Sequence, residues 1–280
     1  MFQIDSEIVR SVYINQPNYK IEYNNSCKAN ICAIYFSSND IYYPNNEDIF
    51  QKRIVEKNFF EWYNTRINAR KHIFIRDIFK QWYLEGINAE LDSPEKIFEW
   101  LKGETEGYEV VTVGSSAGGY SAVLYGSLLK AQKVIAFNAQ FSLKAIADES
   151  GEKCNPLVYK YKNNDRSKYF ELKDKLSDSV NYFYFLSVGC EEDMLQATKL
   201  FTPPPIPPKS FNCLRFKTAH HGIPFLKVAL VKVLNMGEKD LKGFTKKKNY
   251  PIWFTIRMVG VRKTITGFVL QAYRAYRKRR

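Results

Sequence analysis

Short apolar runs alternate with amphipathic stretches along most of the chain. The apolar runs are rich in aromatic and β-branched residues and predict six strands: Ile31–Phe36, His72–Ile75, Glu109–Val113, Val134–Phe137, Tyr182–Val188 and Cys213–Lys217. The stretches between them predict helices: Asp48–Arg66, Pro94–Lys102, Gly118–Lys130, Met194–Leu200 and Ile223–Leu234. Strands that alternate with helices indicate one α/β domain, in which helices cover both faces of a mostly parallel sheet.

Three regions depart from this alternation. Residues 1–30 hold enough Tyr, Ile and Val to add antiparallel edge strands. Residues 139–180 are long for a connection between strands and predict an insertion that caps one end of the sheet. Thr202–Pro208 contains five prolines, which exclude a regular helix or a central strand, so a stiff loop is expected there.

A basic tail follows the α/β domain, which is predicted over residues 1–243. Residues 244–280 hold eleven Lys or Arg and no Asp or Glu, although the whole chain has 42 basic and 29 acidic residues. Residues 1–243 therefore carry 31 basic and 29 acidic side chains, a net charge of only +2. The basic character belongs to the tail, which predicts an anionic partner for the tail rather than for the body.

The tail also has an apolar stripe at helical spacing. Its members recur every three or four residues: Phe254, Met258, Val261, Ile265, Phe268, Ala272 and Tyr276. An apolar stripe beside many basic residues is typical of a helix that lies in the interface of an anionic membrane. A helix docked on a partner protein or on the domain itself, or a tail that attracts a polyanionic acceptor, is the alternative. Nucleic-acid binding is the least favoured interpretation, because the aromatic residues follow the stripe and form no stacking surface.

The cysteines and the N-terminus exclude several classes of protein. Five cysteines, an odd number without C-x-x-C spacing, predict neither a disulfide framework nor a metal site and favour a reducing compartment. The N-terminus carries Asp5 and Glu7, where a secretory signal needs a basic start and an apolar run. No apolar stretch is long enough to predict a membrane-spanning helix.

Residues 109–129 contain the most informative motif. An apolar strand runs into Gly114-Ser115-Ser116-Ala117-Gly118, and a helix-forming stretch follows at once. The pattern G-x-S-x-G between a strand and a helix is typical of a nucleophile elbow, a sharp turn that lifts the serine hydroxyl clear of the sheet. Ser116 is therefore the candidate nucleophile, with Ser115 as the weaker alternative. A plain βα turn, or a turn that binds phosphate, is the competing interpretation.

A serine of ordinary pKa needs a base within hydrogen-bond reach. Of the three histidines, His72 begins an early strand and is expected to be structural. His220 and His221 follow the last predicted strand, where hydrolase-type folds place the base. We favour His221, because Gly222 would let the loop carry its ring over the edge of the sheet. His220 stays open as the alternative.

The third member of a triad, an acid, should follow the strand before the histidine. That strand ends in Cys190-Glu191-Glu192-Asp193. Asp193 is favoured because it lies farthest from the strand end and beside the next helix. The alternatives are Glu191 and Glu192, or an acidic loop that is merely solvated. The chain order Ser, Asp, His is that of the α/β hydrolases.

Further residues are candidates to complete the site. The N–H of Ala117 at the helix start is a candidate oxyanion donor, and the second donor should come from the loop after Ile31–Phe36, at Ser38 or Asn39. A plain polar turn is an equal alternative for that loop. The candidates to line a substrate site are Asn39, Asp77, Trp82 and Tyr83, although a Trp-Tyr pair is often part of a core.

Four segments resemble the capsule O-acetyltransferases of the α/β-hydrolase fold, a group of bacterial polysaccharide-associated proteins: YFSSNDIYYPN, RDIFKQWYLEG, VGSSAGGYSAVLYGSLLKAQKVIAFNAQ and HHGIPFLKVAL. The resemblance covers roughly residues 30–235 and implies an α/β-hydrolase-like sheet. It also implies roles for single residues: Ser116 as acetyl-accepting nucleophile, His221 as base, Asp193 as orienting acid, and Ser38 with Ala117 as oxyanion hole.

The same resemblance implies a two-step acetyl transfer. The acetyl donor would be acetyl-CoA, with no permanently bound cofactor, and the acceptor a hydroxyl of a capsular or cell-surface polysaccharide. A serine esterase or deacetylase that acts on carbohydrate or small esters is the alternative, because it uses the same triad. With the tail, this predicts a cytoplasmic enzyme attached peripherally to the inner face of the cell membrane.

Overall fold

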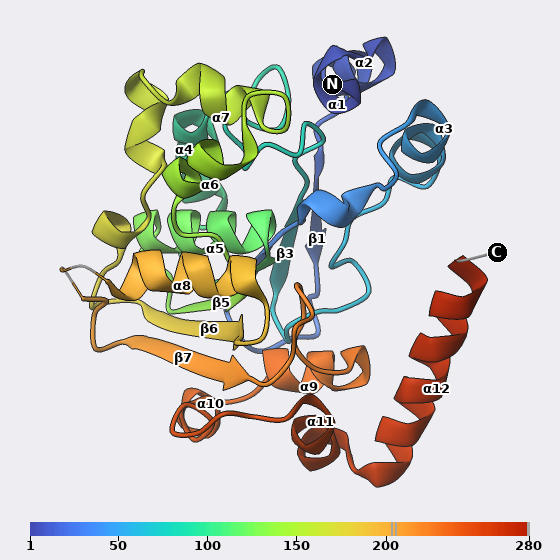
Figure 1. The fold of residues 1–280 in the computed structure, drawn as a ribbon, viewed down its shortest axis with the longest axis vertical. Coiled ribbons are helices and arrows are strands. Elements are labelled where there is room, and N and C mark those ends of the chain that lie inside the picture. The colour runs from blue at the N-terminus through green and yellow to red at the C-terminus, as the bar shows by residue number, and fades with distance from the viewer. Residues whose placement is uncertain (203, 205, 279–280) are drawn as a thin grey trace.

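The structure, a computed structural model, describes residues 1–202, 204 and 206–278, without the side chains of 149–150 and 274–278. In this part of the chain seven strands form one sheet (Figure 1). They are β1 Tyr19–Tyr23, β2 Ile31–Phe36, β3 Lys71–Ile75, β4 Glu109–Ser115, β5 Lys133–Phe137, β6 Asn181–Ser187 and β7 Phe211–Phe216. Their order is β1-β3-β2-β4-β5-β6-β7, and all neighbours are parallel except β1, which is antiparallel to β3.

This sheet confirms the predicted α/β-hydrolase-like fold. Each of the six predicted strands is present, and no strand end moves by more than two residues. The antiparallel edge expected within residues 1–30 is present as β1, whereas the residues before it form two short helices, α1 Phe2–Asp5 and α2 Glu7–Asn15. The central strands are buried almost from end to end, which explains why they are continuous apolar runs.

Helices cover both faces of the sheet (Figure 1). One face packs against α4 Pro94–Glu104, α5 Ala117–Leu128, α6 Leu143–Ser150, α7 Pro156–Tyr161 and α8 Glu191–Phe201. The other packs against α9 Leu230–Leu234, α10 Glu238–Lys242 and α11 Pro251–Val259. Each layer buries its own apolar core, so the carboxyl ends of the parallel strands are held on a rigid base.

The helix that begins at the candidate nucleophile lies deep in the first layer. Eleven of the twelve residues of α5 are buried, which its small and apolar sequence allows. The Thr112 hydroxyl on β4 donates to the Ala122 carbonyl at 2.7 Å and ties the strand to the helix. This packing gives the turn between β4 and α5 little freedom to move.

The predicted helix Asp48–Arg66 is wrong beyond Glu56. A helix α3, Glu47–Phe50, continues as a π-helical turn, Gln51–Glu56, and the chain then turns back toward the sheet. Trp62 is buried in the second core, and its indole N–H donates to the Phe36 carbonyl at 2.9 Å. The apolar residues after Glu56 therefore pack in the second core and do not form one face of a longer helix.

Two predictions near the carboxyl end of the sheet also need correction. Helical structure within Ile223–Leu234 begins only at a short 3₁₀ turn, Lys227–Ala229, which leads into α9. Residues before that turn form an irregular loop, with Phe225 buried in the second core. Glu191, Glu192 and Asp193 were expected in a loop but form the first turn of α8.

The insertion at 139–180 contains α6 and α7 with two 3₁₀ turns, Asp165–Tyr169 and Lys173–Lys175. Figure 1 shows α6 and α7 above α5, near α4. Arg166 ties the insertion to the loop after β3, because its guanidinium donates to the Leu84 carbonyl at 2.6 Å and to Glu85 Oε2 at 3.0 Å. The insertion thus packs on the body through its own apolar residues and through this contact.

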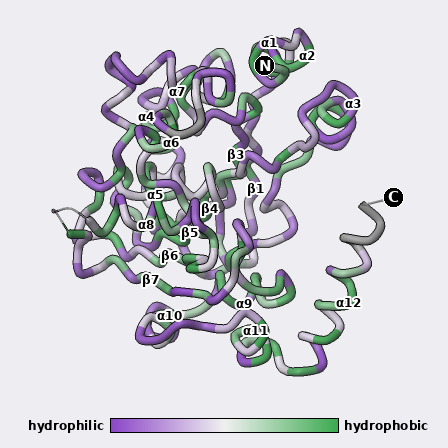
Figure 2. The backbone as a smooth tube through the Cα atoms, in the orientation of Figure 1, coloured by the Kyte–Doolittle hydropathy of each residue, from purple (hydrophilic) through white to green (hydrophobic). Residues whose placement is uncertain are grey.

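The basic tail does not form the single helix that its apolar stripe predicts. Gly260, with φ of +82°, separates α11 from α12 Val261–Lys278. Phe254 and Met258 on α11 are buried in the second core, whereas the apolar side chains of α12 with described exposure lie at the surface. Figure 2 shows hydrophobic residues along both helices. Within the described residues, none of the helices is both long and apolar enough for a membrane span.

Neighbouring residues of α11 allow a stability test of this assignment. Phe254→Ala should lower the free energy of unfolding by about 3–5 kcal/mol, because it leaves a cavity among buried aromatic rings. Trp253→Ala, at a side chain that is 71% exposed, should change it by less than about 0.5 kcal/mol. Denaturant unfolding measures both; equal effects would show that α11 is not docked on the sheet.

Candidate active site

The turn at Ser116 is held in a strained conformation by close backbone contacts. Ser116 has φ of +54° and ψ of −122°, between the end of β4 and the start of α5. A Cβ atom at Gly114 would lie 1.9 Å from the Gly118 carbonyl oxygen, and one at Gly118 would lie 2.3 Å from the Phe36 carbonyl oxygen. Only glycine fits at both positions, so these residues permit the sharp turn that presents the Ser116 side chain.

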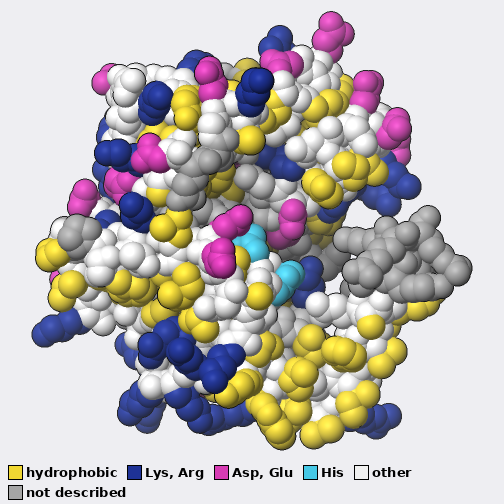
Figure 3. All heavy atoms as spheres, viewed as in Figure 1, with side chains coloured by type: hydrophobic (Ala, Val, Ile, Leu, Met, Phe, Trp, Pro, Cys, Tyr) yellow, Lys and Arg dark blue, Asp and Glu magenta, His cyan; other side chains and the backbone are white. Residues whose placement is uncertain are grey.

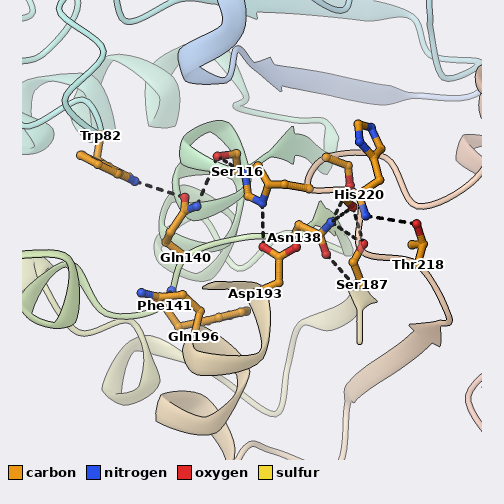
Figure 4. A network of polar contacts seen from close by, with 12 residues as sticks. Trp82, Ser116, Asn138, Gln140, Phe141, Ser187, Asp193, Gln196, Thr218 and His220 are labelled. Atoms are coloured by element: carbon orange, nitrogen blue, oxygen red, sulfur yellow. Dashed lines mark hydrogen bonds and ion pairs between the residues drawn. The ribbon is translucent and has the colours of Figure 1, made fainter. Parts of the chain in front are cut away.

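The structure brings three predicted residues into one line of hydrogen bonds (Figure 4). Ser116 Oγ lies 2.9 Å from His221 Nε2, and His221 Nδ1 lies 2.7 Å from Asp193 Oδ1. Because the Asp193 carboxylate can only accept, Nδ1 carries the proton and Nε2 is left to accept the proton of the Ser116 hydroxyl. This is the tautomer that a base for Ser116 requires.

Asp193 lies at a helix N-terminus, where an anion is favoured. Its side chain is only 3% exposed, and it belongs to the first turn of α8. The positive end of the helix dipole stabilises its charge. Oδ2 has no hydrogen-bond partner among the described residues, so the carboxylate directs its one strong contact to His221.

The surroundings of His221 favour the protonated ring. Burial acts to lower its pKa, but the hydrogen bond from Nδ1 to Asp193 and the charges of Asp193 and Glu192 outweigh this effect. The pKa of His221 is therefore raised above its ordinary value of 6.5. A ring that holds a proton more firmly is a stronger base toward Ser116 once it is neutral.

Buried polar residues fix the loop that carries His221. Asn138 Nδ2 donates to the Gly222 carbonyl at 2.8 Å, and the Ser187 hydroxyl donates to the His220 carbonyl at 2.8 Å. Gly222 has φ of +111°, which confirms that glycine is needed in this loop. The backbone of His220 is tied in this way, while its neighbour His221 turns toward Ser116.

Gln140 contacts the hydroxyl of Ser116, and Trp82 in turn contacts Gln140. Gln140 Nε2 donates to Ser116 Oγ at 3.2 Å, and Trp82 Nε1 donates to Gln140 Oε1 at 3.2 Å (Figure 4). The amide N–H of Gln140 therefore donates to a lone pair of Ser116 Oγ, and the hydroxyl proton of Ser116 remains available for His221. Asn138 and Gln140 are not among the predicted site residues, although both directly follow β5, the strand beside the nucleophile strand. Polar residues that follow a strand next to the nucleophile strand are a sequence signal for a site, and this signal could have identified both.

Two of the residues predicted to line a substrate site are instead structural. Asp77 is buried and accepts from four backbone N–H groups of the loop after β3, at Phe79, Lys80, Gln81 and Tyr83. Burial raises the pKa of Asp77 to about 6, although these N–H groups act to lower it. Tyr83 is buried and donates to the Ser37 carbonyl at 2.9 Å. Both residues shape the loop that presents Trp82.

The predicted oxyanion donors differ in their surroundings. Ala117 begins α5, so its N–H has no acceptor within the helix. The N–H of Ser38 donates to Glu61 Oε2 at 2.6 Å, a contact that the sequence did not predict because Glu61 was assigned to a helix. A cavity of about 210 Å³ is lined by the loop after β2 and by two members of the candidate triad, Ser116 and His221. Its other lining residues include Ser38, Asn39, Asp40, Glu61 and Lys227.

Donor atoms of Cys190, Asp193 and His221 lie within 4.8 Å of one another. Three such groups can bind a soft divalent metal, but His221 and Asp193 are already bonded to each other. Burial and the neighbouring Asp193 raise the pKa of the Cys190 thiol, which disfavours the thiolate that a metal needs. The geometry therefore fits a proton relay better than a metal centre.

Comparisons with known proteins find similar solved structures at low sequence identity. No protein-family model and no curated protein matches the chain. Among solved structures it is similar to the capsule O-acetyltransferase of Neisseria meningitidis serogroup A in complex with caged gadolinium, with 13% identity, a TM-score of 0.45, and coverage of 65% of this chain and 75% of that chain. A variant of that enzyme in complex with CoA has 15% identity, a TM-score of 0.39, and coverage of 65% and 76%.

Esterase B from Lactobacillus rhamnosis is a further similar structure, with 13% identity, a TM-score of 0.37, and coverage of 66% of this chain and 70% of that chain. At these identities the likeness concerns the fold. It does not distinguish acetyl transfer from ester hydrolysis.

The pKa of His221 predicts the pH dependence of Ser116 reactivity. Attack by Ser116 needs neutral His221, and a raised pKa keeps the ring protonated to higher pH. The rate of Ser116 acylation by p-nitrophenyl acetate should therefore fall on the acidic side with a midpoint above 6.5. Asp193→Asn removes the largest of the interactions that raise this pKa, so the midpoint should move to lower pH while the rate drops by about 10⁴-fold. A midpoint that does not respond would show that Asp193 does not set the basicity of His221.

Proposed function

We propose that the chain is a serine acyltransferase that moves an acetyl group from acetyl-CoA to a hydroxyl of a bacterial capsular or cell-surface polysaccharide. The observation that carries the enzyme assignment is the line of hydrogen bonds from Ser116 through His221 to Asp193, at a strained elbow. The acetyl donor and acceptor rest on the resemblance of the four sequence segments to capsule O-acetyltransferases.

The proposed reaction has two steps. In the first, Ser116 Oγ attacks the thioester carbonyl while His221 Nε2 takes the hydroxyl proton, and the C–S bond breaks. His221 returns this proton to the sulfur, so CoA leaves as a thiol. In the second, a sugar hydroxyl gives its proton to His221 and attacks the acetyl-Ser116 ester. The new ester forms, and Ser116 recovers its proton from His221.

Other residues hold the reacting groups in place. The N–H of Ala117, at the positive end of α5, stabilises the negative charge on the carbonyl oxygen in each tetrahedral intermediate. The N–H of Ser38 is the second proposed donor. Gln140 and Trp82 keep the Ser116 hydroxyl oriented, and Asn39 lines the cavity from the other side. Acetyl-CoA acts as a substrate, so no resident cofactor is needed.

A serine esterase is the alternative, because water can replace the sugar hydroxyl in the second step. The two activities share every residue of the first step. They differ in whether the acetyl-enzyme reaches an acceptor hydroxyl before water does.

Incubation with acetyl-CoA and candidate capsular polymers separates these activities. We expect thiol release that depends on polymer, an ester-linked acetyl group on the polymer, and an enzyme mass that increases by one acetyl group when polymer is omitted. Ser116→Ala should abolish all three. Release of acetate alone, with or without polymer, would identify an esterase. Activity in Ser116→Ala would refute the nucleophile assignment.

We also propose that the C-terminal segment attaches the protein to an anionic membrane surface, at the cytoplasmic face where capsular polymers would be made. Six apolar side chains of α12 are at least half exposed: Val261, Ile265, Phe268, Val269, Leu270 and Tyr273. The opposite face of α12 packs on the body through Thr264 and through Gly267, which faces Val228. The exposed face is therefore held outward. Figure 3 shows hydrophobic side chains gathered at the lower right, over α11 and the start of α12.

The C-terminal segment also carries many basic residues. Those with described side chains are Lys246, Lys247, Lys248, Arg257, Arg262 and Lys263, and residues 244–280 hold no acidic residue. Each basic side chain near an anionic surface contributes about 1 kcal/mol to binding. Apolar insertion and charge attraction would thus both favour binding of this segment to an anionic surface.

Flotation with lipid vesicles tests this attachment. The full chain should bind vesicles that contain phosphatidylserine and should bind pure phosphatidylcholine weakly, with binding that falls as salt rises. The pair Ile265→Ser and Phe268→Ser should lower the affinity at least about ten-fold. Burial of each of these apolar side chains in the membrane contributes about 1.5–3 kcal/mol to the free energy of binding. The matched pair Thr266→Ser and Gln271→Ser, at exposed polar positions of α12, should have little effect. Equal loss in both pairs, or binding to neither vesicle, would contradict membrane attachment.

A further inference from the structure

The carboxylate of Glu61 occupies the backbone donor that the proposed oxyanion hole needs. Ser38 lies directly after β2, beside the elbow, where the second donor of such a hole is expected. Its N–H points at Glu61 Oε2, with an N to O distance of 2.6 Å. This distance is short even for a hydrogen bond to a charged acceptor. Of the two proposed donors, the N–H of Ala117 is left for an incoming carbonyl.

Glu61 does not reach this position as part of a regular element. It follows the π-helical turn, in the segment where Trp62 turns inward and bonds to the Phe36 carbonyl. Trp62 and Ser38 thus fix Glu61 from two sides of the end of β2. The carboxyl group lines the same cavity as Ser116 and His221.

The charges around Glu61 give it an alternative partner. Lys227, at the start of the 3₁₀ turn that leads into α9, lines the same cavity, and its charge acts to lower the pKa of Glu61. Burial acts in the other direction, and it raises the pKa of Glu61 overall. Because burial destabilises the charged carboxylate and Lys227 attracts it, Glu61 can be displaced from Ser38 at moderate cost.

A carboxylate oxygen resembles the oxyanion of a tetrahedral intermediate, because both are negatively charged acceptors of the same N–H group. Both cannot occupy the donor at once, and a carboxylate beside the developing oxyanion would repel it. An acyl donor therefore has to displace Glu61 before Ser38 can stabilise its carbonyl oxygen. Loss of one oxyanion donor costs about 10²–10³ in rate in other serine enzymes, so this competition has a large effect.

We propose that Glu61 is an internal ligand of the oxyanion hole, which slows the reaction of small esters. The selection of the acyl donor then depends on binding energy from outside the acyl group. The inference rests on the proposed function. A donor such as acetyl-CoA can use contacts of its nucleotide and pantetheine portions to displace Glu61. A small ester has no such contacts, so it reacts through a hole with a single donor.

Glu61→Ala and Glu61→Gln test this selection. Glu61→Ala should raise kcat/KM for p-nitrophenyl acetate at least about ten-fold, and should raise it much less for acetyl-CoA. Glu61→Gln keeps an acceptor oxygen without the charge, so it should fall between the wild-type protein and Glu61→Ala. Melting curves establish that each variant is folded. A fall in p-nitrophenyl acetate turnover in a folded Glu61→Gln would overturn the proposal, because Glu61 would then assist the reaction.

Asp40→Asn is the matched control, since Asp40 is another carboxyl that lines the cavity. At a pH where His221 is neutral, its effect on p-nitrophenyl acetate turnover should be smaller than that of Glu61→Ala, because the Ser38 N–H donates to Glu61. An equal rise in Asp40→Asn would mean that the general negative charge, and not the contact with Ser38, is responsible, and the proposal would be rejected.

Labelling of Ser116 by a p-nitrophenyl phosphonate ester tests the internal ligand separately from the proposed function. Ser116 attacks the phosphorus and expels p-nitrophenolate, while His221 takes the serine proton. The phosphoryl oxygen then occupies the oxyanion hole. Faster labelling of Ser116 in Glu61→Ala supports the internal ligand even if acetyl-CoA is no substrate. Unchanged labelling, together with normal acetyl transfer, refutes the internal ligand and leaves the transferase proposal intact.

Discussion

The close approach of three backbone segments at the elbow is the constraint on which the site depends. Gly114 and Gly118 pass so near to each other and to the Phe36 carbonyl that neither position has room for a Cβ atom. The chain must therefore turn sharply at Ser116 with positive φ, and the cost of about 1–3 kcal/mol is met by the buried packing of α5. The same contact places the end of β2, and with it Ser38, beside the nucleophile.

The parallel strands place the other residues of the candidate site beside Ser116. The carboxyl ends of β4, β5, β6 and β7 lie along one edge, and Ser116, Asn138, Asp193 and His221 all follow those ends. Asn138 links the strand ends, since its side chain accepts from the Ser187 N–H and donates to the carbonyl of Gly222. The imidazole loop is thereby held by buried polar contacts rather than by regular structure, which keeps His221 within reach of Ser116.

Polar residues around this relay contact one another as well as the serine. Gln140 donates to the Ser116 hydroxyl, Trp82 donates to Gln140, and Glu61 accepts from the Ser38 N–H. Such a site favours a substrate that brings its own binding energy. Helix α12 contacts the body through Gly267 at Val228, next to Lys227, which lines the candidate site, and it presents its apolar side chains to solvent.

The sequence by itself predicted the six strands and the elbow at Ser116, because strand periodicity and turn sterics are local. It favoured His221 and Asp193 but left His220, Glu191 and Glu192 open, and only the tertiary contacts of His221 with Ser116 and Asp193 separate them. It did not determine where Asp48–Arg66 stops being helical, because Trp62 leaves the helix to pack on a distant strand. Nor did it show that Phe254 and Met258 belong to the core while Ile265 does not, since one stripe of apolar residues looks the same whichever surface covers it. The contact between Glu61 and Ser38 was decided only by tertiary structure, because the 23 residues that separate them in sequence carry no pattern that predicts their meeting.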